Sequence, residues 1–385
     1  MKIGIDLLWL RPGKNGGTES YIRNLITGFA TYDDRNEYTL FVSRDNADSF
    51  NSYTRIDPGI RLEICPIDSS NRIRRIAWEN LNLDNLAKKT GMDVMFIPVY
   101  SMPHKKRSNG IPYVVTIHDL QGLHYPEYFT KIRLGFLKRK WKYASEEADV
   151  IIASSDYTKR DIVKNYKAAT DKVRTVYIPV ITGDTAPLSE LSKWGLKTDE
   201  YYYCVSSLLP HKNLYTLIDT FAERFANRQK NGHDEILVIS GVGGESVAKA
   251  ELVKKIESLG IKDNIRFTGY VSDAERNLLY QNCRAFLFPS VFEGFGMPPI
   301  EALMFGRPTV TTEKTCLKEV TCSKAIYVKD PFDTKEWSDA IDRAVSEDRE
   351  FGLLGESDRF KLEKITREYL EIFESFSQST DADRS

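Results

Sequence analysis

Short runs of apolar residues alternate along the chain with longer segments in which apolar residues recur every three or four positions. Runs almost free of polar residues are typical of strands buried on both faces of a parallel sheet, and the longer segments are typical of helices that cover it. The predicted strands of the first half are Lys2–Leu8, Tyr38–Ser43, Asp93–Pro98, Tyr113–His118, Asp149–Ala153 and Val173–Ile178. Those of the second half are Tyr201–Ser206, Ile236–Gly241, Ile265–Thr268, Ala285–Pro289, Pro308–Thr311 and Ala325–Val328. The pattern therefore predicts an α/β protein with two doubly wound parallel sheets.

The hydrophobic pattern also divides the chain. It lapses between Ile181 and Glu200, where Thr, Gly, Asp, Pro and Ser gather, and a length of 385 residues suggests two domains. We place the first domain at residues 1–190 and the second at residues 191–359. An apolar stripe of helical period follows in residues 360–377, after the second sheet is complete. We expect this helix to cross back and pack on the first domain. The predicted helices of the first half are Thr18–Phe29, Ile76–Lys89, Lys131–Glu147 and Asp156–Tyr166.

Composition narrows the class of protein. The 54 Lys and Arg residues balance 55 Asp and Glu residues, so the net charge of −1 gives no overall field that would hold nucleic acid. Five cysteines without a Cys-x-x-Cys pair indicate a reducing compartment rather than a disulfide scaffold or a zinc site. Asp6 interrupts the first apolar run, and no apolar stretch reaches the roughly 18 residues of a membrane span. We expect a cytoplasmic protein without a secretion signal.

The most informative segment is Phe288–Ala302. A strand ends at Pro289, a loop carries Glu293-Gly-Phe-Gly296, and two prolines mark the first turn of a helix that contains Glu301. Backbone amides at such a helix start can bind an anion, and the two carboxylates can accept hydrogen bonds from sugar or ribose hydroxyls. A glutamate pair taken alone is more often a solvated loop residue and a helix residue that complements the dipole.

The segment as a whole resembles the signature of the retaining glycosyltransferases of family 4, which have the GT-B fold. That signature has two glutamates separated by seven residues, preceded by Pro-Ser and enclosing Gly-Phe-Gly, and every part is found here. The resemblance extends over roughly Met1 to Phe376. It implies two Rossmann-like domains that face each other across a cleft.

The resemblance also implies an activity. It implies a metal-independent hexosyltransferase that moves a sugar with retention from a nucleotide-diphosphate donor, GDP-mannose or similar. The acceptor would be a glycan or a polyprenyl-diphosphate-linked glycan in bacterial surface polysaccharide synthesis, of lipopolysaccharide or capsule. The block Pro289–Pro299 and the run Leu208–Asn213 look like those of mannosyl- and rhamnosyltransferases.

The resemblance assigns roles in the second domain. Glu301 would bind the ribose hydroxyls, and the loop from Glu293 through Gly294, Phe295 and Gly296 would bind the sugar. Lys212 would neutralise the departing diphosphate, although a lysine at a helix start is by itself more often solvated. Many relatives carry an arginine five residues before this lysine, where this chain has Ser207. His211 or the loop amides would then neutralise part of the diphosphate charge.

In the first domain the resemblance points to two places. His118 ends a predicted strand and would meet the donor sugar near the reaction centre, whereas its position alone equally suits a capping residue. Gly16 and Gly17, in the loop Gly13–Glu19 after the first strand, would contact the donor phosphate or the acceptor. The turn Gly241–Gly244 and the segment Thr315–Glu319 also resemble family elements, the latter without a defined role. Ser154, Ser155 and Thr158 are interpreted as a helix cap.

We expect no metal and no cofactor beyond the donor substrate. The only Asp-x-Asp motif is Asp381–Asp383 near the chain end, and no His or Cys cluster has the spacing of metal ligands.

Residues 71–145 are strongly basic, with 14 Lys and Arg residues against five Asp and Glu residues. The segment Lys131–Tyr143 places these cations among aromatic and aliphatic residues, as in helices that lie on an anionic membrane. The alternative is a helix that packs its apolar face on the sheet while its cations are solvated. A peripheral position at the inner face of the cell membrane is therefore one of two interpretations.

Other classes compete with the transferase interpretation. A nucleotide-sugar 2-epimerase would share the two-domain architecture, and a two-lobed sugar- or nucleotide-binding protein would bind without turnover. The latter would carry a secretion signal, which we do not expect here. A dehydrogenase is disfavoured because Gly13–Gly17 lacks the Gly-x-Gly-x-x-Gly spacing.

Overall fold

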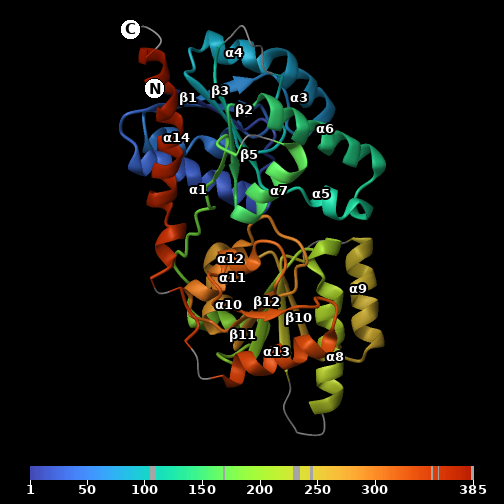
Figure 1. The fold of residues 1–385 in the computed structure, drawn as a ribbon. Coiled ribbons are helices and arrows are strands. Elements are labelled where there is room, and N and C mark those ends of the chain that lie inside the picture. The colour runs from blue at the N-terminus through green and yellow to red at the C-terminus, as the bar shows by residue number, and fades with distance from the viewer. Residues whose placement is uncertain are drawn as a thin grey trace. The chain divides into compact units, whose positions relative to one another are not determined.

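The computed structural model describes residues 1–104, 110–167, 170–228, 235–242, 246–347, 350–353 and 355–382. The chain forms two compact units (Figure 1). The first unit contains Met1–Pro179 and Asp358–Ser385, and the second contains Val180–Ser357. Each unit has its own sheet and its own core.

The first unit is built on a seven-stranded sheet in the order β3-β2-β1-β4-β5-β6-β7. All neighbouring strands are parallel. The strands are β1 (Lys2–Asp6), β2 (Glu37–Ser43), β3 (Ile60–Cys65), β4 (Val94–Ile97), β5 (Tyr113–Ile117), β6 (Val150–Ala153) and β7 (Val173–Thr175). The helices are α1 (Gly17–Tyr32), α2 (Tyr53–Ile56), α3 (Arg72–Trp78), α4 (Asp84–Lys89), α5 (Gln121–His124), α6 (Lys131–Glu147), α7 (Asp156–Tyr166) and α14 (Leu362–Ala382). A π-helical turn over Glu79–Leu83 joins α3 to α4.

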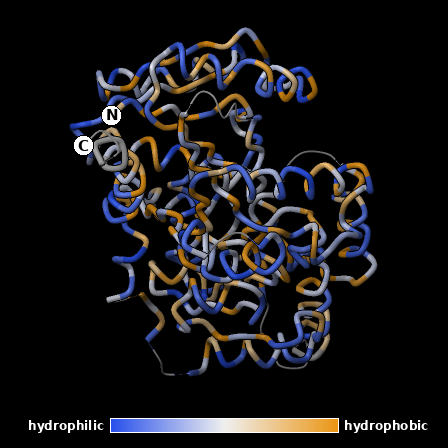
Figure 2. The backbone as a smooth tube through the Cα atoms, turned by 45° about the horizontal axis from the view of Figure 1, so that its top comes forward, coloured by the Kyte–Doolittle hydropathy of each residue, from blue (hydrophilic) through white to orange (hydrophobic). Residues whose placement is uncertain are grey.

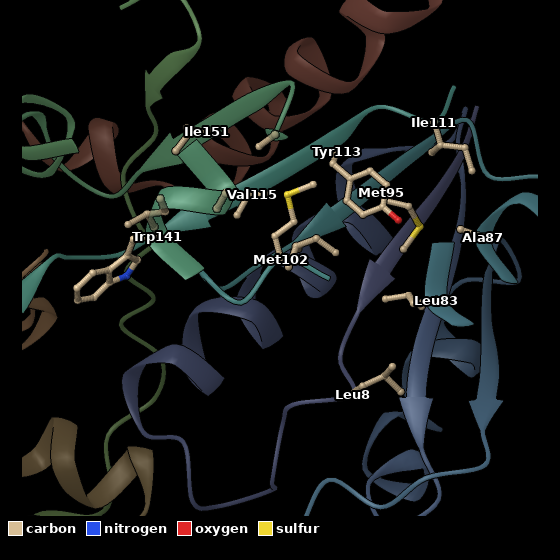
Figure 3. Packing of buried hydrophobic residues seen from close by; sticks show 14 of the residues in the cluster. Leu8, Leu83, Ala87, Met95, Met102, Ile111, Tyr113, Val115, Trp141 and Ile151 are labelled. Atoms are coloured by element: carbon tan, nitrogen blue, oxygen red, sulfur yellow. The ribbon is translucent and has the colours of Figure 1, made fainter. Parts of the chain in front are cut away.

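Helices cover both faces of this sheet. One core cluster combines strand residues with Leu83, Ala87, Leu137, Trp141 and Ala144 from the segment that joins α3 to α4, from α4 and from α6. Figure 3 shows part of this cluster, with Met95, Tyr113 and Val115 on the strands. Helices α1 and α14 lie against each other, and a Cβ on Gly28 would lie 2.9 Å from a methyl of Leu362.

The second unit repeats the arrangement with six parallel strands in the order β10-β9-β8-β11-β12-β13. The strands are β8 (Tyr201–Val205), β9 (Ile236–Ser240), β10 (Ile265–Gly269), β11 (Ala285–Phe288), β12 (Thr309–Thr312) and β13 (Ile326–Val328). The helices are α8 (Leu214–Arg228), α9 (Val247–Ser258), α10 (Asp273–Asn282), α11 (Met297–Met304), α12 (Leu317–Val320) and α13 (Thr334–Ser346). Tyr203, Tyr280, Phe286 and Phe288 lie in the core of this unit.

Part of the basic stretch is buried inside the first unit. Arg75 and Lys140 are both 8% exposed. The guanidinium of Arg75 donates to Glu79 at 2.6 Å, and the ammonium of Lys140 donates to the carbonyl of Met102 at 3.0 Å. Burial and the nearby carboxylate of Asp6 raise the pKa of Glu79 to about 8. These two cations therefore stabilise the fold and are not part of a basic surface.

Hydrophobic and hydrophilic residues alternate along the chain in Figure 2. Helices that cover a sheet have this pattern because only one of their faces is buried. None of the described helices combines the length and the apolar composition that crossing a membrane requires.

The structure contains all twelve predicted strands and one that the pattern did not predict, β3. Here Arg61 and Glu63 alternate with apolar residues at the sheet edge, and Ile64 is exposed. The α3–α4 segment begins at Arg72, earlier than the predicted Ile76, and α14 continues to Ala382 beyond the predicted end.

The division of the chain falls after Pro179, whereas the predicted boundary followed residue 190. The intervening segment is held by the second unit. Ala186 donates its N–H to the carbonyl of Ala274, and the amide of Asn277 donates to the carbonyls of Gly183 and Asp184. A composition shift marks a linker, but these hydrogen bonds decide which unit the linker joins.

Candidate functional site

The order of strands identifies the edge at which a ligand would bind in the second unit. Strands β8 and β11 are neighbours although two other strands lie between them in the sequence. The direction in which strands are added reverses here. The loops after these two strands therefore leave the sheet on opposite faces, and open α/β sheets bind ligands at such points.

The loop after β8 carries Lys212. Its last turn is a 3₁₀ turn over Pro210–Lys212, and Asn213 follows in the left-handed region with φ of 51°. The amide of Asn213 donates to the carbonyl of Pro331 at 2.7 Å, and its side-chain oxygen accepts from the hydroxyl of Thr216. These bonds fix the turn at the start of α8 and thus the direction of the lysine side chain.

The loop after β11 brings Glu293 to this lysine. The Nζ atom of Lys212 lies 2.6 Å from Oε1 of Glu293, and the side chains are 21% and 13% exposed. The ammonium also lies 5.3 Å from the ring centre of Phe288. Each charge is thus largely removed from solvent and matched by the other, which makes the loss of either one costly.

Backbone bonds join the same two loops. The N–H of Val291 donates to the carbonyl of His211 at 2.8 Å, and the hydroxyl of Ser290 donates to the same carbonyl at 3.1 Å. Burial lowers the pKa of His211 to about 4, so its imidazole is neutral near pH 7 and adds no positive charge. Ser207, also on the first loop, is half-buried.

Gly294, Phe295 and Gly296 lead from the second loop into α11. Gly296 has a φ of 85°, a conformation that favours glycine, and Met297 begins the helix with two prolines directly after it. Gly294 and Phe295 are buried, with Phe295 4% exposed.

Glu301 lies just over one turn into α11, and α10 holds its carboxylate. The hydroxyl of Tyr280 donates to Oε2 at 2.8 Å, and a guanidinium nitrogen of Arg276 lies 3.5 Å from Oε1. The side chain of Glu301 is 12% exposed. The second unit thus gathers Ser207, Lys212, Glu293–Gly296 and Glu301 at one edge of its sheet.

His118 lies at the carboxyl edge of the first sheet, directly after β5. Its Nε2 atom is 3.1 Å from the carbonyl oxygen of Pro98. Because a carbonyl only accepts, Nε2 carries the proton and Nδ1 keeps its lone pair. The ring of Tyr21 packs edge-on at 4.8 Å, and burial lowers the pKa of His118 to about 4. His118 is therefore a neutral hydrogen-bond acceptor near pH 7.

Gly16 and Gly17 follow β1 at the same edge of the first sheet. Gly16 precedes α1 with φ of 52°, and Gly17 is the first residue of the helix. The preceding loop is fixed by Glu19, which accepts from the N–H of Gly13 at 2.8 Å and from Arg23 at 2.9 Å. The predicted site residues therefore form two groups, one on each unit. Of the predicted turn Gly241–Gly244, residues 243 and 244 lie outside the described residues.

Several residues at the site were not predicted to act there. Ser154 and Thr158, interpreted as a helix cap, donate through their hydroxyls to the carbonyl of His118. Ser155 is the residue that caps α7. Tyr280 and Arg276 carried no signal in the sequence, because only the fold brings α10 beside α11.

Among the described residues, no group of three or more His, Cys, Asp or Glu side chains is arranged to hold a metal ion.

Two family models match the chain. The model described as Glycosyltransferase Family 4 matches residues 15–183, and the model described as Glycosyl transferases group 1 matches residues 189–361. All but the last few residues of the first match belong to the unit that carries His118, and all but the last few of the second belong to the unit that carries Lys212, Glu293 and Glu301.

Curated relatives include two bacterial mannosyltransferases. The chain is 29% identical over 228 residues to the O-antigen chain mannosyltransferase RfbU of Salmonella typhimurium, covering 59% of each protein. It is 27% identical over 290 residues to the O-antigen chain mannosyltransferase B of Escherichia coli, covering 72% of each. The chain thus spans less than two thirds of the length of RfbU.

Solved structures share the fold over nearly the whole chain. The Anabaena protein Alr3699/HepE in complex with UDP and glucose has a TM-score of 0.72 at 19% identity and covers 97% of this chain and 100% of its own. The lipopolysaccharide outer core galactosyltransferase WaaB has a TM-score of 0.63 at 17% identity, covering 97% of this chain and 99% of its own.

The low pKa of His118 predicts a dependence of stability on pH. In the unfolded chain this histidine takes up a proton near pH 6.5, whereas in the folded chain it does so only near pH 4. The contribution of His118 to the free energy of unfolding is therefore fully present above pH 6.5. It is lost as the pH falls toward 4, by up to about 1.4 kcal/mol per pH unit. Urea unfolding of the wild type and of His118→Gln at pH 7 and pH 5 should show a smaller loss in the variant. Equal losses in both proteins would contradict the neutral state of His118 in the folded protein.

Proposed function

Because this chain is a GT-B glycosyltransferase of the family 4 type, we propose that it transfers a hexose, with retention and without a metal, from a nucleotide-diphosphate sugar. The proposed donor is GDP-mannose or a similar sugar nucleotide. The proposed acceptor is a hydroxyl of a glycan or of a polyprenyl-diphosphate-linked glycan in surface polysaccharide synthesis. The names of the two bacterial relatives, both O-antigen chain mannosyltransferases, support mannose as the sugar and the O-antigen chain as the kind of acceptor.

The observation that carries the proposal is the Lys212–Glu293 ion pair between the ends of β8 and β11. Transfer of a sugar leaves a nucleoside diphosphate, whose negative charge grows as the glycosidic bond breaks. A fixed cation with little access to water stabilises that charge in the transition state. The lysine is fixed by the turn around Asn213, and Glu293 sets the direction of its ammonium.

The remaining groups of the second unit suit the rest of the donor. Glu301 would accept hydrogen bonds from the two ribose hydroxyls, because Tyr280 and Arg276 hold its carboxylate in place. Gly294 carries no side chain, which would let the backbone of this loop approach a sugar closely. Ser207 stands where many relatives carry an arginine, so Lys212 and backbone amides would carry the charge of the diphosphate.

The first unit would contribute His118 and the acceptor surface. The lone pair on Nδ1 of His118 would accept a hydrogen bond from a hydroxyl of the donor sugar. Gly16 and Gly17 would leave the backbone accessible to the donor phosphate or the acceptor. His118 has a catalytic role in this proposal through orientation of the sugar, not through proton transfer, because its pKa of about 4 makes it a weak base.

We propose attack of the acceptor on the same face that the diphosphate leaves, with the leaving phosphate taking the acceptor's proton. A double displacement needs a carboxylate that is free to bond to the sugar carbon. Glu293 is the carboxylate of the sugar loop, and it is held by Lys212. Its proposed catalytic role is therefore to orient the lysine and the sugar.

We place the protein in the cytoplasm, peripherally at the inner face of the membrane where a lipid-linked acceptor would lie. The surface that supports attachment, the basic face, consists of exposed cations and two exposed isoleucines on α3 and α6. Ile73 is 83% and Ile132 is 88% exposed, and the guanidinium of Arg72 on α3 lies 5.2 Å from the ring centre of Phe136 on α6. Its cations are Arg72, Arg74, Lys131, Arg133, Lys138, Arg139 and Lys142. Anionic headgroups would attract the cations while the isoleucines enter the interface.

A donor screen in EDTA tests the proposed reaction. The protein is incubated with GDP-mannose, UDP-glucose, UDP-GlcNAc, UDP-galactose and dTDP-rhamnose, and released nucleoside diphosphate is measured together with the anomer of the product. We expect one donor to be consumed with retention in EDTA, and Lys212→Met to slow release by 10²-fold or more, on the order of the loss seen when one charge-stabilising donor is removed.

Lys193→Met is the matched control, because Lys193 is exposed in the same unit and pairs with Glu275. An isomerised donor without release would instead indicate an epimerase, and binding without turnover would indicate a binding protein. Loss of activity in EDTA that manganese restores would refute the metal-independent mechanism.

A vesicle assay tests membrane attachment. We expect the protein to sediment with phosphatidylglycerol vesicles at low salt but not with phosphatidylcholine vesicles. Ile73→Ser with Ile132→Ser should reduce sedimentation several-fold because the inserted apolar area is lost. Val247→Ser is the control, since Val247 is 77% exposed in the other unit. Equal sedimentation of all variants, or none of the wild type, would contradict attachment through this face.

A further inference from the structure

The segment between β12 and α12 contacts the backbone of the loop that carries Glu293. It contains Thr315 and Cys316, and Leu317 begins α12. A Cβ on Gly296 would lie 2.8 Å from a methyl of Leu317, so the two segments are in close contact. The sequence analysis gave Thr315–Glu319 no defined role. The motif around Glu293 does not predict that this segment contacts the Glu293 loop.

Thr315 has an unfavourable backbone conformation. Its φ of 53° lies in the left-handed region, which costs a β-branched residue more than most others and costs glycine least. Its hydroxyl oxygen accepts the N–H of Glu293 at 3.2 Å. Such strain persists only where the surrounding structure compensates for it, and it concentrates at functional sites.

Cys316 holds the same loop through its thiol. The side chain is fully buried, and its sulfur lies 3.2 Å from the carbonyl oxygens of both Glu293 and Phe295. A thiol can donate to either carbonyl, whereas a thiolate can donate to neither. Burial and the carboxylate of Glu293 raise the pKa of Cys316, which keeps the thiol protonated. The N–H and the carbonyl of Glu293 are thus both bonded to neighbouring residues of one short segment.

We propose that Thr315 and Cys316 are positioning residues that hold the Glu293–Phe295 backbone in the conformation that binds the donor sugar. Thr315 keeps its strained conformation because its hydroxyl is needed at the N–H of Glu293. This inference rests on the proposed function, since it assigns these residues to the sugar loop. Neither residue touches the donor in the proposal; both act through Glu293 and Phe295.

The variant Thr315→Gly tests whether Thr315 positions the sugar loop for donor binding or only contributes to the stability of the fold. Thr315→Gly relieves the backbone strain but removes the hydroxyl, so we expect an unchanged or higher Tm together with a donor KM raised about three- to tenfold, the size of one lost hydrogen bond. Thr315→Ser keeps the hydroxyl and should retain the wild-type KM. Ser323→Gly is the matched control, because Ser323 is exposed and has a φ of 58° in the same unit. It should leave KM unchanged.

The thiol is tested in the same way. Cys316→Ala should raise the donor KM, while Cys65→Ala removes a buried thiol from the other unit and should leave KM unchanged. All variants are assayed with the five donors of the screen, and Tm is measured for each.

A Thr315→Gly variant with the wild-type KM would overturn the inference while wild-type turnover upholds the proposed function. A rise in KM that Thr315→Ser shares equally would also overturn it. A wild type that turns over none of the five donors would overturn the proposed function, and the inference with it.

Discussion

The strand order of each sheet is the constraint on which the site depends. In the second unit the chain adds β9 and β10 on one side of β8 and then returns to add β11 on the other side. Parallel strands need crossover connections, so this reversal sends the loops after β8 and β11 to opposite faces. Lys212 and Glu293 come from these two loops and meet as an ion pair at 2.6 Å. The proposed chemistry of the site depends on this ion pair.

Neighbouring residues fix the charged groups of this site in place. Asn213 fixes the turn of Lys212, Tyr280 binds Glu301, and the segment after β12 binds the backbone of Glu293. The site is therefore organised before a ligand arrives, which reduces the cost of ordering it during binding or reaction. His118 in the first unit follows the same rule, since the carbonyl of Pro98 fixes its tautomer.

The sequence predicted the features that depend on short stretches of the chain. Continuous apolar runs revealed the central strands, because such strands are buried on both faces, whereas the alternating edge strand β3 gave a weaker pattern. The motif indicated Glu293 and Glu301, but not the groups that hold them, because Tyr280 and Thr315 reach the site through tertiary packing. The basic stretch likewise could not show that Arg75 and Lys140 are buried beside Glu79.

We propose above all that Lys212 provides the charge that binds the diphosphate of the donor. Calorimetric titration of GDP, GMP, UDP and UMP into the wild type and Lys212→Met measures it most directly, because a diphosphate and its monophosphate differ only in the group that the lysine would contact. We expect the wild type to prefer the diphosphate of at least one base, and Lys212→Met to lose most of that preference and to have a lower Tm, because Glu293 loses its partner. An undiminished preference in the variant would show that Lys212 does not bind the diphosphate.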